Sequence, residues 1–175
     1  MNAVIPASRE ATAPASQRDD SQYLTFLLGG EMFAIGILNI KEIIEYGQVT
    51  EVPMMPGFIR GVINLRGRVV PVVDLSVRFG RERTTVNKRT SIVILEVGTD
   101  GERQDIGVVV DAVSEVLAIP GSEIEPPPAF GARIRSDFIS GMGKVAGRFV
   151  IILNVGNMLS VEEMVELAGA MPSGA

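Results

Sequence analysis

The chain contains neither histidine nor cysteine among its 175 residues. Without these side chains it cannot use Ser-His-Asp or Cys-His catalysis, histidine phosphotransfer or thiol redox chemistry, and nearly all zinc sites are excluded. The lack of cysteine also excludes a disulfide framework, which fits a reducing compartment. We therefore expect no catalytic residues, no metal site and no cofactor.

Aromatic residues make up only 5% of the chain, and the net charge is −5. Such a chain offers few rings for stacking on bases and no basic surface for phosphates, so nucleic acid is not an expected partner. No apolar run approaches the roughly 18 residues that a membrane span requires, and the N-terminus lacks a basic segment followed by an apolar one. The sequence predicts a cytoplasmic protein that does not insert into a membrane.

Short segments rich in β-branched residues dominate the rest of the chain and are separated by Gly, Asp and Pro. Residues 1–21 precede them; they are rich in Ala, Ser and Pro and are expected to form a disordered tail. The expected strands are residues 23–28, 31–37, 61–66, 68–75, 91–97, 105–113 and 148–155. This pattern predicts a mostly β fold.

Only three stretches favour helix. Residues 39–45 and 74–80 are short candidates, and Ser160 followed by Glu163 is a capping-box signature for a C-terminal helix over 161–168. Residues 169–175 are expected to be a flexible end. The isoleucines near the first candidate repeat at helical spacing, which fits plain core packing as well as an exposed apolar face. They are Ile37, Ile40, Ile43 and Ile44.

The sequence contains an internal repeat. Residues 61–75 align without gaps with 141–155, at an offset of 80, and residues 33–44 align with 106–117, at an offset of 73. The second alignment places Ile40 opposite Val113. Two copies of a unit too small to bury much by itself predict two small five-stranded barrels, related by a pseudo-twofold axis around a shared hydrophobic core. We expect them to form one domain, residues 22–168, with a groove between the barrels.

Motifs that could carry chemistry are weak. The GMGKVA segment matches a nucleotide-binding pattern, but a second strand follows it at once, which predicts a hairpin turn instead. Asp74 and Asp111 could form an acid/base pair, although the position of Asp74 at the end of a strand is more typical of a helix cap. The PMMP run, residues 53–56, could either contact a partner or fold over the barrel.

Arginines occupy the expected turn between residues 61–66 and 68–75, where Asn-Gly would suffice. Arg66 is either a solvated turn residue or a functional one. In the second case its guanidinium meets a carboxylate, on a partner or on Glu42, while Gly61 and Gly67 permit the backbone bends that hold it there.

Four segments carry a resemblance to a known family: EIIEYGQVTEVP, FIRGVINLRGRVVPVVDL, IGVVVDAVSEVL and FISGMGKVAGRFVIILNV. Through them the chain resembles the CheW family of bacterial chemosensory adaptors from about Tyr23 to Leu167, and the NLRGR-x-x-P-V-V-D-L segment is highly specific to that domain. The resemblance implies two five-stranded SH3-like barrels and a non-enzymatic scaffold. That scaffold would couple the cytoplasmic tips of chemoreceptors to the regulatory domain of the histidine kinase CheA, recruited from the cytoplasm to membrane-associated receptor arrays. Because the chain has no room for a receiver or kinase, we expect a free-standing adaptor.

The resemblance also implies two sets of site residues. The receptor-binding set is Leu24, Ile37, Ile40, Glu42, Gly61, Arg66 and Val113. The kinase-binding set is Val49, Val52 and Pro53. Two alternatives remain open: an adaptor of a chemosensory-like pathway with a non-flagellar output, and a sensor that binds a small ligand in the groove between the barrels.

Overall fold

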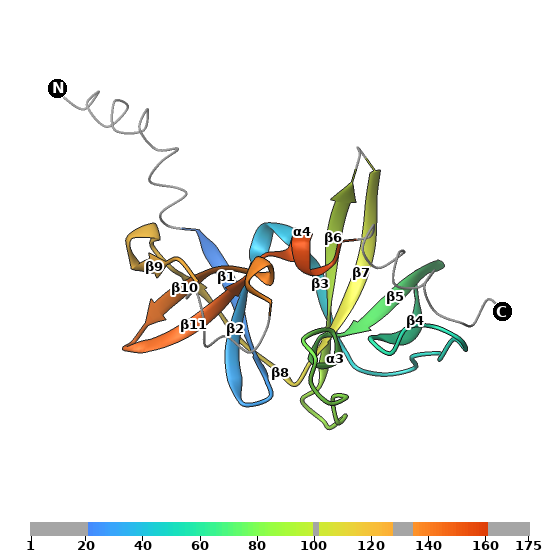
Figure 1. Ribbon diagram of the computed structural model, residues 1–175. Coiled ribbons are helices and arrows are strands. Elements are labelled where there is room, and N and C mark those ends of the chain that lie inside the picture. The colour runs from blue at the N-terminus through green and yellow to red at the C-terminus, as the bar shows by residue number, and fades with distance from the viewer. Residues whose placement is uncertain (1–20, 100–101, 128–134, 161–175) are drawn as a thin grey trace.

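The computed structural model describes residues 21–99, 102–127 and 135–160, and its strands form two sheets that lie side by side (Figure 1). The strands are β1 (Gln22–Leu28), β2 (Glu31–Gly36), β3 (Ile40–Glu45), β4 (Ile59–Leu65), β5 (Arg68–Asp74), β6 (Ser91–Thr99), β7 (Glu102–Val110), β8 (Ala112–Ala118), β9 (Ile124–Glu125), β10 (Ile139–Val145) and β11 (Arg148–Leu153). The five-stranded sheet has the order β3-β6-β7-β5-β4, and the six-stranded sheet has the order β8-β1-β2-β11-β10-β9. The prediction of a mostly β fold is confirmed, and the two-residue strand β9 supplies the sixth strand.

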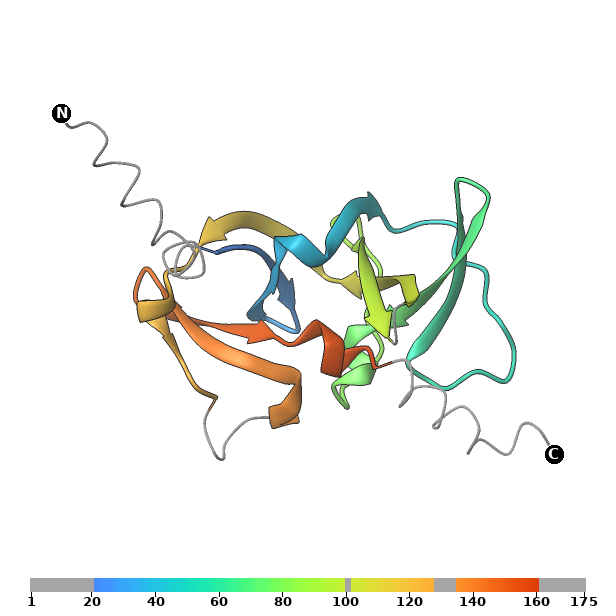
Figure 2. The ribbon, with the colours of Figure 1, turned by 90° about the horizontal axis from the view of Figure 1, so that it is seen from above.

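Helical elements within the described residues are short. They are the 3-10 turns η1 (Ile37–Asn39), η2 (Gly121–Glu123) and η3 (Ser136–Phe138), and the helices α3 (Leu75–Arg78) and α4 (Val155–Met158). Helix α4 lies between the two sheets in both views (Figures 1 and 2). Residues 1–20 of the tail expected over 1–21, the helix expected over 161–168 and the flexible end expected over 169–175 lie outside the described residues.

The sequence repeat reappears in the strand register. In the five-stranded sheet Val72 pairs in parallel with Gly107, and in the six-stranded sheet Ile152 pairs in parallel with Ala34. The partners in these two pairs are related by the two offsets of the sequence repeat, 80 and 73. The burial pattern of residues 61–70 also recurs position by position in residues 141–150. The two sheets are therefore structurally equivalent to each other, as the pseudo-twofold relation predicts.

Each copy of the repeat is divided between the two sheets instead of forming one of them. The chain leaves the six-stranded sheet after β2, passes through η1 and enters the five-stranded sheet as β3. It returns after β7, turning at Asp111 into β8 of the six-stranded sheet. The alignment of the repeats could not show this exchange, because it fixes the order of strands but not their neighbours.

The largest apolar cluster lies between the sheets, which confirms the shared core. It joins Phe26 and Phe33 of the six-stranded sheet to Val93, Leu95 and Val108 of the five-stranded sheet. On the other face of β6, Ile92 and Ile94 belong to a second cluster confined to the five-stranded sheet. A third cluster, with Ala34, Ile119, Val150 and Ile152, lies within the six-stranded sheet. The central strands of each sheet are thus buried on both faces, which explains their continuous apolar runs.

The prediction of a helix over residues 39–45 is wrong. Asn39 ends η1, and residues 40–45 form β3, where burial alternates along the strand between half-buried and exposed. Because isoleucine is β-branched and fits a pleated surface, pairing of Ile40 with Leu95 of β6 outweighs the helical spacing. The helix expected over 74–80 is confirmed in part as α3, which begins after the cap Asp74.

Candidate partner-binding surfaces

Two equivalent edges of the sheets carry the central candidate residues. Ile40 opens β3 and pairs with Leu95, while Val113 lies near the start of β8 and pairs with Phe26. Strands β3 and β8 are the outer strands of their sheets. Both side chains are half-buried and pack against the shared core. Ile37, in η1, is also half-buried, so all three residues are partly exposed.

Leu38 was missed by the sequence reasoning. Its side chain is 96% exposed, at the centre of η1 where the chain crosses between the sheets. The signal was present, because Ile37 and Leu38 are adjacent and two adjacent apolar side chains cannot both face one core on a regular element. A leucine so fully exposed beside Ile40 adds apolar surface to this edge.

The assignment of Leu24 to the receptor-binding surface must be corrected. It is 2% exposed and belongs to the shared core. Strand β1 lies between β8 and β2, so Leu24 pairs with a neighbour on each side. A side chain buried in this way cannot touch a partner directly, and Leu24 serves to support the surface above it.

At the tip of the β4–β5 hairpin, Arg66 donates a hydrogen bond from Nη2 to Oε1 of Glu42, 2.5 Å away. The Glu42 alternative for the arginine's carboxylate partner is therefore confirmed. This hydrogen bond, and then the charge of the carboxylate, raises the pKa of Arg66 above its ordinary value. The contact is a single hydrogen bond and not a bidentate one, and the Arg66 side chain is 71% exposed.

The turn that carries Arg66 uses left-handed backbone. Arg66 has φ +53° and Gly67 has φ +84°, the combination required by a tight two-residue hairpin turn. Ala146 and Gly147, with φ of +52° and +79°, form the equivalent turn between β10 and β11. The interpretation of GMGKVA as a hairpin is confirmed.

Ion pairs surround the Arg66 contact. Lys41 and Arg68 both pair with the buried carboxylate of Asp105, at 3.2 Å and 3.1 Å. Together with Arg66 and Glu42 they line a cavity of about 140 Å³, which we call the charged cavity. Its complete lining is Lys41, Glu42, Leu65, Arg66, Arg68, Ile94 and Asp105. Three cations and two carboxylates give this cavity a net charge of +1.

The assignment of Gly61 to the receptor-binding surface must also be corrected, because this residue is buried within β4. A Cβ atom at this position would lie 2.3 Å from the carbonyl oxygen of Thr50, and the backbone has φ +150°. Thr50 and Val62 exchange two backbone hydrogen bonds of 2.8 Å, so the connection after β3 lies directly on β4. Gly61 permits this close approach and offers no surface to a partner.

The candidate kinase-facing residues lie on that connection. Val49 is half-buried and packs against the second cluster, whereas Val52 and Pro53 are exposed. Met54 is 64% exposed and Met55 is 40% exposed, so the methionines of the PMMP run do not fold over the sheet. Four consecutive residues thus present an exposed, largely apolar strip beside β4.

The two aspartates considered as a catalytic pair have separate structural roles. Asp74 accepts a hydrogen bond from the Ser76 amide, which confirms it as a helix cap, and pairs with buried Arg60 at 2.6 Å. Asp111 accepts a hydrogen bond from the Gly29 amide at 2.8 Å. Within residues 21–99, 102–127 and 135–160, no cluster of three or more acidic residues could hold a metal ion. Nor does this part of the chain contain a helix long and apolar enough to cross a membrane.

The fold and surfaces define a β protein of two equivalent sheets with apolar residues exposed at their edges. The family described as "CheW-like domain" matches residues 22–163, and the chain therefore belongs to the CheW family. The chain is 36% identical over 150 residues to a Chemotaxis protein CheW of Klebsiella aerogenes, covering 86% of this chain and 88% of that protein. It is 27% identical over 168 residues to a Chemotaxis protein CheW of Treponema pallidum, covering 93% and 96%.

A solved structure shows the same fold. The scaffolding protein TtCheW from Thermoanaerobacter tengcongensis superposes with a TM-score of 0.72 at 34% identity, covering 79% of this chain and 87% of that one. These relatives and the solved scaffolding protein support a scaffolding role in chemotaxis.

Proposed function

We propose that the chain is a non-enzymatic adaptor that couples the cytoplasmic tips of chemoreceptors to the histidine kinase CheA. Family membership and the scaffolding relative support the role. The observation that carries it is the apolar surface at the two equivalent sheet edges, formed by Ile37, Leu38, Ile40 and Val113. The adaptor would act in the cytoplasm and be recruited to receptor arrays.

The sheet edges suit a receptor helix. An amphipathic helix places its apolar side chains into a groove at intervals of three and four residues, and the groove must offer apolar side chains in fixed positions. Ile40 and Val113 meet this requirement because each is anchored on the shared core. Since they are ordered before binding, less side-chain entropy is lost when the complex forms.

The connection after β3 suits the kinase. Its exposed residues Val52, Pro53, Met54 and Met55 are held at one end by the pair of hydrogen bonds between Thr50 and Val62. Methionine side chains are flexible and polarisable, which favours them on surfaces that pack against a partner. The proposed partner is the regulatory domain of CheA.

The Arg66–Glu42 pair would contribute specificity. The contact with Glu42 uses Nη2 alone, and within the described part of the chain no other residue bonds to the Arg66 guanidinium. A guanidinium carries five N–H donors, so most of its donors are available to a carboxylate of a partner. Glu42 then fixes the arginine's direction, and Arg66 joins the proposed receptor-binding surface.

The test uses isothermal titration of the full chain with isolated receptor-tip fragments and, separately, with the CheA regulatory domain. Leu38→Glu should weaken binding of the receptor tip and leave binding of the kinase domain unchanged. Met54→Glu should do the reverse, so each variant is the matched control for the other. Both side chains are largely exposed, so neither change should unfold the chain.

Two results would contradict the proposal. One is wild-type affinity of both variants for both partners. The other is saturable binding of a compound from a metabolite library together with indifference to both proteins, which would instead identify the small-ligand sensor.

A further inference from the structure

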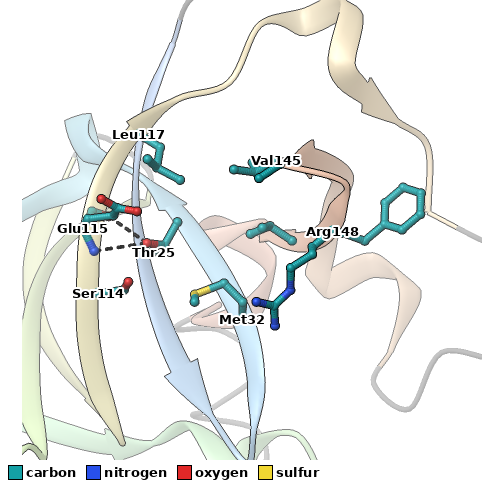
Figure 3. Close-up of a pocket in the computed structure, with 10 residues that line it drawn as sticks. Thr25, Met32, Ser114, Glu115, Leu117, Val145 and Arg148 are labelled. Carbon is teal, nitrogen blue, oxygen red and sulfur yellow. Dashed lines mark hydrogen bonds between the residues drawn. The ribbon is translucent and has the colours of Figure 1, made fainter.

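A second cavity, of about 180 Å³, lies in the six-stranded sheet (Figure 3). Ser114, Glu115 and Leu117 of β8 line one side, and Val145 and Arg148 of the β10–β11 hairpin line the other. Thr25, Met32, Ala146, Phe149 and Val150 complete the lining. We call it the open cavity.

The open cavity is the pseudo-twofold equivalent of the charged cavity. The offset of 73 relates Lys41 to Ser114, Glu42 to Glu115, and Met32 to Asp105; the offset of 80 relates Leu65 to Val145, Arg66 to Ala146, and Arg68 to Arg148. Ile94 and Thr25 correspond because they pair with Gly107 and Ala34, which are themselves equivalent. All seven residues that line the charged cavity therefore have a counterpart in the lining of the open one.

The two cavities differ in what pairs with the glutamate that both copies of the repeat contain, Glu42 in one and Glu115 in the other. In the charged cavity Glu42 receives Arg66 from the hairpin tip. In the open cavity Ala146 stands at the position of Arg66 and cannot reach across. The backbone of Glu115 is fixed by two hydrogen bonds with the Thr25 hydroxyl, at 2.8 Å and 3.2 Å. None of the described residues pairs with the Glu115 carboxylate.

An added arginine would make the open cavity match the charged cavity in net charge. Its charged residues are Glu115 and Arg148, so its net charge is zero. One added arginine would give +1, the net charge of the charged cavity, with the same pairing of carboxylate and guanidinium. Arg148 does not forbid this, because its equivalent, Arg68, lines the charged cavity together with Arg66.

We propose that the open cavity is a docking site for an arginine side chain of a partner protein, whose guanidinium pairs with Glu115 as Arg66 pairs with Glu42. Leu117, Val145 and Val150 give the cavity apolar walls that suit the methylene stem of arginine. Phe149, 53% exposed, lies at the cavity and offers apolar surface for residues that flank the arginine. This docking site is separate from the receptor and kinase surfaces proposed above.

The probe is N-acetyl-arginine methylamide, titrated into the ¹⁵N-labelled full chain and followed by amide chemical shifts. We expect saturable shifts centred on residues 114–117 and 145–149, with a dissociation constant on the order of millimolar. The citrulline analogue keeps the shape but lacks the charge, so it should bind about fivefold more weakly. Shifts spread over the surface, or equal affinity for both compounds, would overturn the proposal.

Variants test the pairing directly. Glu115→Gln should weaken binding of the probe about as much as the change from arginine to citrulline does. Glu42→Gln, the same substitution in the charged cavity, should leave the affinity for the probe unchanged. Ala146→Arg should fill the open cavity from within and abolish the shifts. This substitution is compatible with the turn, because Ala146 and Arg66 have φ of +52° and +53°. Unchanged affinity in both Glu115→Gln and Ala146→Arg would refute the docking site.

Free L-arginine separates a protein partner from a metabolite. The capped probe lacks the free α-amino and α-carboxylate groups that a metabolite site would recognise. If the cavity receives a partner's side chain, free arginine should bind no more tightly than the capped probe. Tenfold tighter binding of free arginine would overturn docking of a protein and identify a site for the amino acid.

Discussion

The guanidinium of Arg78 lies 4.7 Å from the centre of the Phe138 ring. It also lies 5.3 Å from the ring of Phe58, and Phe58 and Phe138 are themselves equivalent under the offset of 80. Arg78 Nε donates a hydrogen bond of 2.9 Å to the carbonyl oxygen of Met158. One side chain of α3 thus contacts both copies of the repeat and the end of α4.

Replacing Arg78 by alanine should therefore weaken the packing of the two sheets. We expect a loss of about 1–3 kcal/mol in the free energy of unfolding, from the two ring contacts and the hydrogen bond. The measurement is urea unfolding. Arg103→Ala is the control, because the exposed Arg103–Glu96 pair should contribute less than about 1 kcal/mol. Equal effects of the two substitutions would show that Arg78 does not join the sheets.

The two glycines of the first hairpin should respond differently to alanine. At Gly67 a Cβ would meet nothing within 4 Å, so the cost is left-handed strain alone, about 1 kcal/mol. At Gly61 the Cβ would collide with the Thr50 backbone, so Gly61→Ala should cost more and release the connection after β3. Hydrogen exchange of the Thr50 and Val62 amides reports that release, and protection equal to wild type would contradict it.

The pKa of Asp137 is lowered below its ordinary value of 3.8, first by the hydrogen bond from Arg135. Its ionised form is favoured in the folded state, so its contribution to stability is present above the unfolded pKa and is lost as the pH falls through the folded one. The side chain is exposed, so this contribution is small. A carboxyl ¹³C titration should give a midpoint below 3.8, and Arg135→Ala should raise it. A midpoint unaffected by that substitution would contradict the assignment.

Arg66 should matter for coupling but little for folding. Because its side chain is 71% exposed, Arg66→Ala should change the free energy of unfolding by less than about 0.5 kcal/mol. Arg66→Lys keeps the charge but not the planar guanidinium, so it should restore little of the function. The assay is kinase phosphorylation rate in a reconstituted mixture of receptor, adaptor and CheA. Full activation with Arg66→Ala at wild-type concentrations would show that Arg66 is only a turn residue.

Local patterns in the sequence were enough to predict much of the fold. The repeat predicted the pseudo-twofold relation and the shared core, because matched apolar positions must be buried in matched ways. Asp74 could be identified as a cap from its position at the end of a strand, whereas Glu42 was one of two alternatives for the carboxylate that Arg66 meets. Residues 39–45 could not be assigned correctly, because isoleucine spacing fits both periods and the choice depended on pairing with β6.

Features that depend on strand neighbours could not be predicted. Burial of Leu24 follows from the place of β1 between β8 and β2, and exchange of strands between the sheets leaves no mark in the alignment. The open cavity needs the registers of β1, β2, β8 and the β10–β11 hairpin together. Even so, the change from Arg66 to Ala146 within the repeat was readable from the sequence and marks the difference between the two cavities.

The most direct test of the proposed adaptor function is the affinity of the receptor-tip fragment for Ile40→Glu and Val113→Glu, measured by titration calorimetry. Both residues lie on the sheet edges and are anchored on the shared core. We predict at least about a tenfold loss of affinity for each, with unchanged binding of the kinase domain and a native circular dichroism spectrum. Val86→Glu, at an exposed apolar residue outside the proposed surfaces, should bind like wild type. Wild-type affinity of both edge variants, or their unfolding, would contradict a receptor-binding surface at these edges.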